Sequence, residues 1–306
     1  MLRAAIAAIT TACFCAAPGL AQQGGLAHVE TRGEGEMHLV LVPGLLCDWS
    51  VWESFMERNG SRYTMHAVTL PGFGGTDPLP EPDSIEGTPW IDSAVESIAG
   101  YIEAEGLEAP IVVGHSLGGH IALRLSFEHP ERIGGVVSVD GMAAMPLAGM
   151  RGIGEARRAE VVENQIGPTM LGAPDAQWYA QMEFQGPVQM TDQELYRSWM
   201  KTFRQTPADV GKRYMIELMK SDVTDDLANA GTRIFLMPAD NEPQQRFLGG
   251  EAAVKAIWAV QVERAPEELV TMLFAPDSRH FIMFDRPEWF DEHIEKFVEG
   301  EAIGPR

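Results

Sequence analysis

A serine held between two glycines is the first residue of this sequence that could do chemistry. The stretch GHSLG, residues 114–118, matches the pattern G-x-S-x-G, in which a sharp strand-to-helix turn exposes a serine side chain. The apolar run IVV precedes it and an amphipathic helical pattern follows it. Because a serine hydroxyl is a weak nucleophile, it needs a base and donors that bind the developing oxyanion. Ser116 is therefore a candidate nucleophile whose partners the rest of the chain must supply.

The predicted base is a histidine near the end of the chain. In proteins with this serine turn, the acid and then the histidine follow the serine along the sequence. Of the eight histidines, only His280 and His293 lie late enough. His280 follows a predicted strand in a loop, whereas His293 falls within a predicted helix and is expected on the surface. His115 adjoins the serine, but its side chain is expected to point elsewhere in a structural role.

Two aspartates are candidates for the acid that would orient His280. Asp240, in FLMPAD, follows the penultimate predicted strand, from which a carboxylate can stabilise the imidazolium. Asp140 ends GVVSVD and could reach the same imidazole from one strand over, or cap the helical segment that follows. We favour Asp240, with Asp140 as the alternative.

Two backbone amides are predicted to form the oxyanion hole. The N–H of Leu117 directly follows the nucleophile at a helix N-terminus, where amides lack partners and the helix dipole favours negative charge. The second is expected after an earlier strand, in LVLVPGLLCDW. Gly44 permits a close backbone approach there, so the Leu45 amide is the second candidate donor.

Short apolar runs alternate with longer helical patterns along the chain, which predicts an α/β fold with a mostly parallel, doubly wound sheet. The predicted strands are residues 38–42, 63–69, 111–114, 135–140, 233–237 and 270–274. The predicted helices are residues 49–58, 89–105, 117–129 and about 287–298. Each candidate catalytic residue therefore follows a predicted strand.

The alternation breaks once, between residues 141 and 227. This segment has no convincing strand and holds nine of the chain's 16 methionines, mostly within helical patterns. Methionine adapts to irregular apolar surfaces, so we predict an inserted helical cap over a hydrophobic pocket. The α/β core would then comprise residues 22–140 and 228–306.

Six motifs follow one another along the chain: VPGLLCDW, LPGFGGTD, VVGHSLGG, HPERIGGVVSVDG, FLMPAD and SRHFIMFDRPEWFDEHIEKF. In this order, they make the sequence resemble capped serine hydrolases of the α/β-hydrolase superfamily, which include esterases and lactonases. The resemblance covers about residues 37–299. It implies a Ser116, His280 and Asp240 triad, with Leu45 and Leu117 amides in the oxyanion hole.

Two positions depart from the pattern of that family. Pro43 replaces the usual histidine before the oxyanion glycine, which keeps the amide but removes a polar neighbour. The loop of Asp240 lacks its common glycine, which is why Asp140 remains the alternative acid. Serine at the turn, where dehalogenases and epoxide hydrolases of this fold carry aspartate, argues against both of those activities.

Composition excludes several other classes of protein. The net charge is −21 and no Lys/Arg cluster stands out, which argues against a nucleic-acid partner. No Cys/His cluster suggests a metal site, and no motif predicts a cofactor.

Residues 1–21 resemble a signal peptide with cleavage near Ala21, which predicts a periplasmic or secreted protein without stable membrane insertion. Cys47 is then the only cysteine of the mature chain, so no intramolecular disulfide can form.

The sequence predicts a serine hydrolase that cleaves an ester or lactone of a small to medium, largely apolar molecule. Two alternatives stay open. The same triad could cleave an amide, an N-terminal peptide residue or a carbon–carbon bond, and Glu183 or Glu194 would then suit an aminopeptidase. The other alternative is a binding protein that retains the fold without activity. The oligomeric state is left open.

Overall fold

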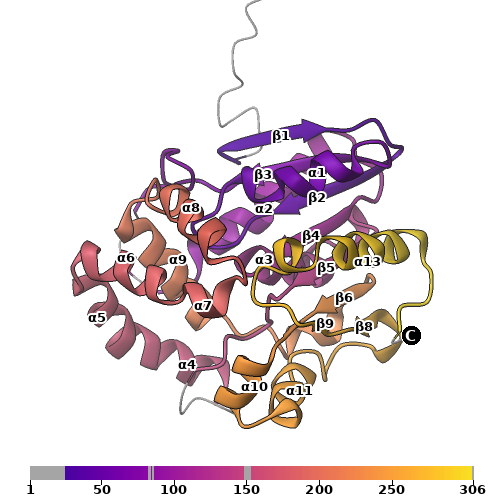
Figure 1. Ribbon diagram of the computed structural model, residues 1–306. Helices are drawn as coiled ribbons and strands as arrows, with labels where there is room; N and C mark the ends of the chain where they lie inside the picture. Colours follow the sequence, from indigo (N-terminus) through magenta and orange to yellow (C-terminus); the bar gives the residue numbers. More distant parts are fainter. Residues whose placement is uncertain (1–24, 82–83, 85, 148–152, 305–306) are drawn as a thin grey trace, which may run out of the picture.

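A seven-stranded sheet forms the centre of the molecule (Figure 1). The computed structural model describes residues 25–81, 84, 86–147 and 153–304, so the predicted signal peptide lies outside the described residues. The strand order is β1-β3-β2-β4-β5-β6-β8, and all neighbours are parallel except β1 and β3. The strands are β1 (His28–Arg32), β2 (Met37–Val42), β3 (Tyr63–Thr69), β4 (Ile111–His115), β5 (Gly135–Val139), β6 (Ile234–Met237) and β8 (Val270–Met272). The predicted mostly parallel α/β sheet is confirmed.

Helices cover both faces of this sheet, which is why its strands read as nearly continuous apolar runs. Val40 and Val112 point to the face covered by α2, α3 and α11, whereas Leu39 and Val113 point to the face covered by α1 and α13 (Figure 1). These helices are α1 (Glu53–Asn59), α2 (Pro89–Ala104), α3 (Leu117–Glu128), α11 (Glu251–Ala259) and α13 (Pro287–Glu299). Short 3-10 helices span Trp49–Trp52, Pro130–Arg132, Asp226–Asn229 and Glu267–Leu269. The buried sheet fixes where each strand ends, and so positions the loops that carry the candidate site.

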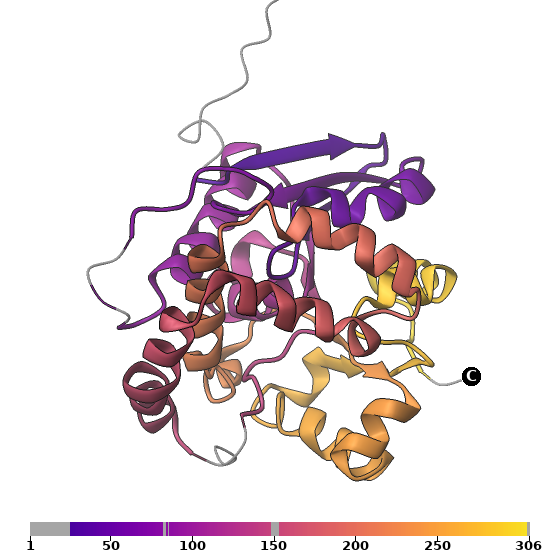
Figure 2. The ribbon, with the colours of Figure 1, turned by 60° about the vertical axis from the view of Figure 1, so that its left-hand side comes forward.

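The segment between β5 and β6 is helical. Its elements are α4 (Glu155–Val161), a π-helical turn (Val162–Ile166), α5 (Gly167–Gly172), α6 (Asp175–Phe184), α7 (Gly186–Gln189), α8 (Gln193–Phe203) and α9 (Ala208–Lys220). Figures 1 and 2 show these helices gathered on one side of the molecule. We refer to α4–α9 as the cap helices.

Several short elements were not predicted from the sequence. The edge strand β1 is only half buried, so its residues HVETR lack an apolar run. Beyond the end of β6, the chain forms a second, two-stranded parallel sheet from β7 (Ala239–Asp240) and β9 (Ala275–Pro276). The remaining helices are α10 (Glu242–Leu248) and α12 (Ile282–Asp285). The small sheet matters for the site, since it carries Asp240.

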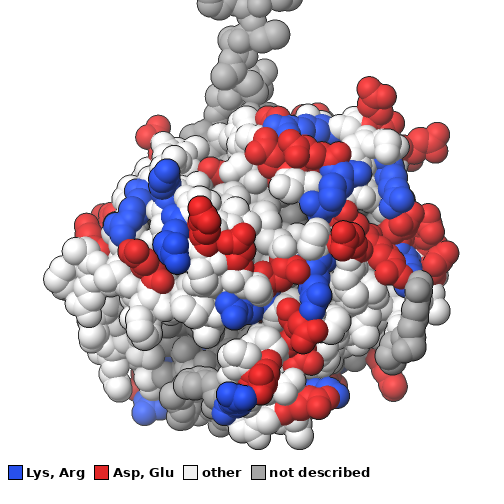
Figure 3. Space-filling view, viewed as in Figure 1, with Lys and Arg blue, Asp and Glu red and all other residues white. Residues whose placement is uncertain are grey.

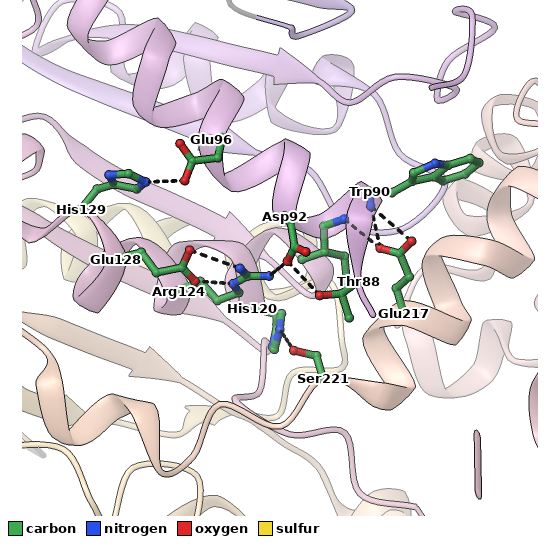
Figure 4. A network of polar contacts seen from close by, with 11 residues as sticks. Thr88, Trp90, Asp92, Glu96, His120, Arg124, Glu128, His129, Glu217 and Ser221 are labelled. Carbon is green, nitrogen blue, oxygen red and sulfur yellow. Dashed lines mark hydrogen bonds and ion pairs between the residues drawn. The ribbon is translucent and has the colours of Figure 1, made fainter. Parts of the chain in front are cut away.

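Polar contacts between buried side chains join the cap helices to the core (Figure 4). Glu217, on α9, accepts hydrogen bonds from the backbone amides of Trp90 and Ile91 at the start of α2. His120, on α3, forms hydrogen bonds through its two ring nitrogens with the carbonyl oxygen of Met142 and the hydroxyl of Ser221. Both ends of the cap segment are thus tied to helices that pack on the sheet.

The Glu217 contact predicts a pH dependence of stability. Burial raises the pKa of Glu217 from 4.5 to about 7, against the lowering effect of the Ile91 and Trp90 amides. Because the pKa is higher in the folded state, this stabilisation is complete below the unfolded-state pKa and is lost as pH rises through the folded-state value. We expect the unfolding free energy of the wild type, relative to Glu217→Gln, to fall by up to about 3 kcal/mol between about pH 5 and 8.

Denaturant unfolding of both proteins across this pH range measures the difference. Subtracting the variant removes the contributions of the titrating groups that the two proteins share, among them His120, whose pKa burial lowers to about 4. A difference that stays constant with pH would contradict the prediction.

Acidic and basic side chains are interspersed on the face shown in Figure 3. Arg58 forms a two-bond ion pair with Asp291, and Arg62 pairs with Glu295. Exposed pairs of this kind contribute little to stability. In the part of the chain that the structure describes, no helix has the length and apolarity needed to cross a membrane.

Candidate active site

Ser116 occupies the sharp turn between β4 and α3. Its backbone has φ 54° and ψ −113°, a strained conformation for a residue with a side chain. A Cβ on Gly114 would overlap the backbone of Gly118, and a Cβ on Gly118 would overlap that of Val42. The glycines therefore allow strand and helix backbones to approach closely, as the G-x-S-x-G pattern predicts. The turn presents the Ser116 side chain to a pocket.

The loop after β2 lies directly beside the serine. A Cβ built on Gly44 would lie 3.2 Å from Ser116 Cβ, so only glycine fits at this distance from the turn without displacement. Leu45 follows and lines the same pocket as Ser116. Leu117 is the first residue of α3, where backbone amides have no partner within the helix. The two predicted donors thus come from the segments that flank Ser116.

His280 contacts Asp140. The distance from His280 Nδ1 to Asp140 Oδ2 is 2.7 Å, and the two side chains are 23% and 11% exposed. Asp140 follows β5 directly and has a positive φ of 47°. Its second oxygen, Oδ1, accepts a hydrogen bond from the amide of Ala239 at 2.8 Å. These contacts hold the carboxylate in one orientation and hold His280 through one ring nitrogen, which leaves Nε2 for chemistry.

Asp240, the acid favoured from the sequence, does not contact His280. Its Oδ1 accepts a hydrogen bond from the side chain of Gln245, on α10, at 2.6 Å. The physical reason lies in the chain after β6. It enters the small β7–β9 sheet, where Asp240 pairs with Pro276, and the carboxylate turns toward α10 instead of His280. The structure therefore brings together Ser116, His280 and the alternative acid Asp140.

The pocket beside Ser116 has a volume of about 80 Å³. The core contributes Leu45, Leu46, His115, Ser116, His280 and Phe281, and the cap helices and their linkers contribute Met182, Gln185, Gln189, Tyr196, Phe203 and Met215. Most of these side chains are apolar or aromatic, and neither an acidic side chain nor a lysine or arginine is among them. Glu183 and Glu194, the carboxylates considered for an aminopeptidase, are both exposed and do not line the pocket.

His115 belongs to the site, contrary to the expectation that its side chain points elsewhere. It lines the pocket and is 1% exposed. Its ring lies 4.6 Å from the His280 ring, measured between centroids, and its Nε2 lies 3.0 Å from the His280 carbonyl oxygen. Sequence reasoning treated this position only as a neighbour of the serine, although its place directly before the nucleophile was a signal that could have found it.

Other reactive side chains lie apart from the pocket lining. Cys47 is buried, and burial raises the pKa of its thiol, which disfavours a nucleophilic thiolate. Among the described residues, Glu96, Glu128 and His129 form the one group with the spacing of metal ligands. Glu128 is already paired there with Arg124 (Figure 4). This group lies on the outer side of α2 and α3 and includes no candidate catalytic residue.

Solved structures share this fold at low sequence identity. An esterase from Thermogutta terrifontis superposes with a TM-score of 0.67 at 16% identity, covering 89% of this chain and 93% of that one. The enol-lactonase from Burkholderia xenovorans LB400 gives a TM-score of 0.65 at 14% identity and covers 89% and 96% of the two chains.

A curated sequence relative matches part of the chain. A pimeloyl-(acyl-carrier protein) methyl ester esterase from Salmonella newport (strain SL254) is 33% identical over 110 residues. The match spans 36% of this chain and 39% of the relative, well under half of either. A family model described as the alpha/beta hydrolase family matches residues 39–293, most of the chain. The resemblance inferred from the motifs is thereby confirmed: the chain belongs to the alpha/beta hydrolase family.

Proposed function

We propose that this protein hydrolyses carboxylic esters through an acyl-enzyme formed on Ser116. The observation that carries the proposal is the 2.7 Å contact between His280 and Asp140 at a pocket that Ser116 also lines. A nucleophile, a base oriented by a carboxylate and nearby backbone amides are the groups that acyl transfer to serine requires. The relative and the two structural neighbours reported above are named as esterases and a lactonase. These names support an ester as the substrate rather than another acyl compound.

In the proposed reaction, His280 Nε2 takes the proton of Ser116 as the serine oxygen attacks the ester carbonyl. The amides of Leu45 and Leu117 donate hydrogen bonds to the tetrahedral oxyanion, and Asp140 stabilises the imidazolium through Nδ1. His280 then gives the proton to the departing alcohol. Water attacks the acyl-enzyme in the second half of the reaction, with His280 again as base, and the acid is released.

The pocket favours a short, uncharged acyl or alcohol group. The cavity of about 80 Å³ is well above the volume that a single buried water molecule needs, but it is small for an organic substrate. Apolar contacts come from side chains such as Met182, Phe203 and Met215. An anionic substrate would find no lysine or arginine in this lining to pair with its charge. We therefore propose short-chain neutral esters or lactones as the substrate class.

A chain-length series tests this substrate class. With p-nitrophenyl esters from acetate to decanoate, we expect kcat/KM to peak at a short acyl chain and to fall toward decanoate, because the cavity is small and bulky side chains line it. Steady-state hydrolysis by the purified protein measures the profile. A rate that keeps rising to the longest chain would contradict the proposed pocket size, and no turnover of any ester by folded protein would reject the esterase proposal.

Two other bonds compete with the ester. The amide alternative in its aminopeptidase form loses its basis, since Glu183 pairs with Arg204 at 3.4 Å on the surface and a peptide N-terminus would meet no carboxylate in the pocket. Cleavage of a carbon–carbon bond by the same triad remains the second candidate. An acyl-chain series of anilides and a matching diketone, assayed beside the esters, separates these activities.

We also propose that residues 1–21 direct export to the periplasm or the medium. The alanine-rich apolar run after Arg3 supports this proposal. N-terminal sequencing of protein recovered from fractionated cells tests it: a new N-terminus near residue 22 in the exported fraction is expected. Protein that keeps its N-terminus in the cytoplasmic fraction would reject it.

A further inference from the structure

The His115 side chain lies between three parts of the candidate site. It directly precedes Ser116 in the chain. A Cβ built on Gly44 would lie 2.7 Å from His115 Nδ1, so the imidazole packs against the loop after β2. On its other side, Nε2 lies 3.0 Å from the carbonyl oxygen of His280, and the ring packs 4.5 Å from that of Phe281. One buried ring therefore separates the loop that carries the base from the loop after β2.

The contact with the His280 carbonyl fixes the protonation of this ring. A carbonyl oxygen only accepts hydrogen bonds, so Nε2 must carry the proton and donate it. His115 Nδ1 is then an acceptor, and it is buried without a hydrogen-bond partner among the described residues. An unpaired buried acceptor destabilises the folded state. A hydrophobic side chain at this position would avoid this destabilisation. The presence of a histidine beside the base therefore indicates a use for the donor on Nε2.

The ring also stays neutral. Burial lowers the pKa of His115 well below its ordinary value, and the neighbouring His280 lowers it further. A second cation at this position would oppose the positive charge that His280 acquires when it takes the serine proton. A neutral ring can hold the His280 main chain without that repulsion.

We propose that His115 is a positioning residue, which donates from Nε2 to the His280 carbonyl and so holds the base at its working distance from Ser116. The inference rests on the proposed function, because it assigns His280 the role of base. Asp140 orients the imidazole through Nδ1, and His115 fixes the backbone that carries it. Without this second anchor, the His280 ring would shift relative to the nucleophile, and its hydrogen bond to Asp140 would be disturbed.

Three substitutions of His115 distinguish the effect of its hydrogen-bond donor from the effect of its ring. The amide nitrogen of glutamine reaches about as far from the backbone as His Nε2, whereas that of asparagine reaches only as far as Nδ1. His115→Gln therefore keeps a donor for the His280 carbonyl, His115→Asn places it too close to the backbone, and His115→Phe keeps a ring without a donor. Because a shift of about 1 Å can cost 100-fold in rate, we expect kcat to fall at least tenfold in the Asn and Phe variants. KM should change little, and the Gln variant should stay within about threefold of wild type.

A second measurement needs no substrate. The proton shared by His280 Nδ1 and Asp140 should give a low-field NMR signal that is absent from Asp140→Asn. We expect the signal to be unchanged in His115→Gln and displaced or broadened in the Asn and Phe variants, with thermal unfolding confirming that each is folded.

The outcomes separate a failure of the positioning role from a failure of the proposed function. Wild-type kcat and signal in His115→Asn, or an equal loss in the Gln and Asn variants, would overturn the positioning role. If the wild type hydrolyses no ester, the proposed function fails, and the NMR comparison still decides whether His115 holds His280.

Discussion

Replacing Asp140 with asparagine is expected to lower kcat for ester hydrolysis by about 10³–10⁴-fold, with little effect on KM. The carboxylate accepts from His280 Nδ1 at 2.7 Å, so it fixes the tautomer in which Nε2 is free to accept the serine proton. An asparagine there can present its NH₂ group to Nδ1 and favour the wrong tautomer. It would also fail to stabilise the imidazolium.

Asp240→Asn is the matched control for this prediction. It makes the same change from carboxylate to amide at the residue that was favoured from the sequence. In the structure, the Asp240 carboxylate binds Gln245. We expect this variant to keep kcat within about threefold of wild type, because its carboxylate makes no contact with His280 and an asparagine oxygen can still accept the hydrogen bond from Gln245. Steady-state kinetics of both variants on one ester measures the contrast. A large loss in Asp240→Asn, with near-normal Asp140→Asn, would reverse the assignment of the acid.

Removing the nucleophile is expected to have the largest effect. Ser116→Ala should lower kcat by about 10⁵–10⁶-fold, because the acyl-enzyme can no longer form and only binding and the oxyanion donors remain. The fold should persist, since alanine keeps the Cβ in the strained turn and removes only the hydroxyl. Hydrolysis of p-nitrophenyl butanoate, with thermal unfolding as the check on folding, measures the loss. Residual turnover within tenfold of wild type would exclude Ser116 as the nucleophile.

The sheet and the positions of the chemistry on it were predictable from local pattern. Continuous apolar runs such as IVV mark strands buried on both faces, and the predicted strand 63–69 has the bounds observed. The glycines around Ser116 are required by backbone crowding, which is a local property that sequence retains. Parallel strands end at one edge, which is why Ser116, Asp140 and His280 lie near one another in the structure.

The choice between Asp140 and Asp240 depended on a tertiary feature. Both follow neighbouring strands, and the missing glycine in the loop of Asp240 is a local difference that did not decide between them. The difference comes from the positive φ at Asp140 and from the short β7–β9 sheet that turns Asp240 toward Gln245. Two-residue strands have no periodicity to detect, so this sheet could not be predicted.

The hydrogen-bond partner of His115 could not be predicted from sequence, although its place beside Ser116 could be read there. Its partner, the carbonyl of His280, lies 165 residues away, and backbone carbonyls have no sequence signature. The helices between β5 and β6, in contrast, could be predicted, because the segment between these strands lacks strand patterns and contains helical ones. Which of those helices face the pocket depended on their packing.

The most direct test of the central claim is covalent labelling of the purified protein by a fluorophosphonate, followed by peptide mass spectrometry. Such reagents react with a serine only when a base and an oxyanion hole activate it. We predict one adduct per chain, on the peptide that contains Ser116, and its loss in Ser116→Ala. Folded wild-type protein that remains unlabelled, or label that persists undiminished in Ser116→Ala, would contradict it.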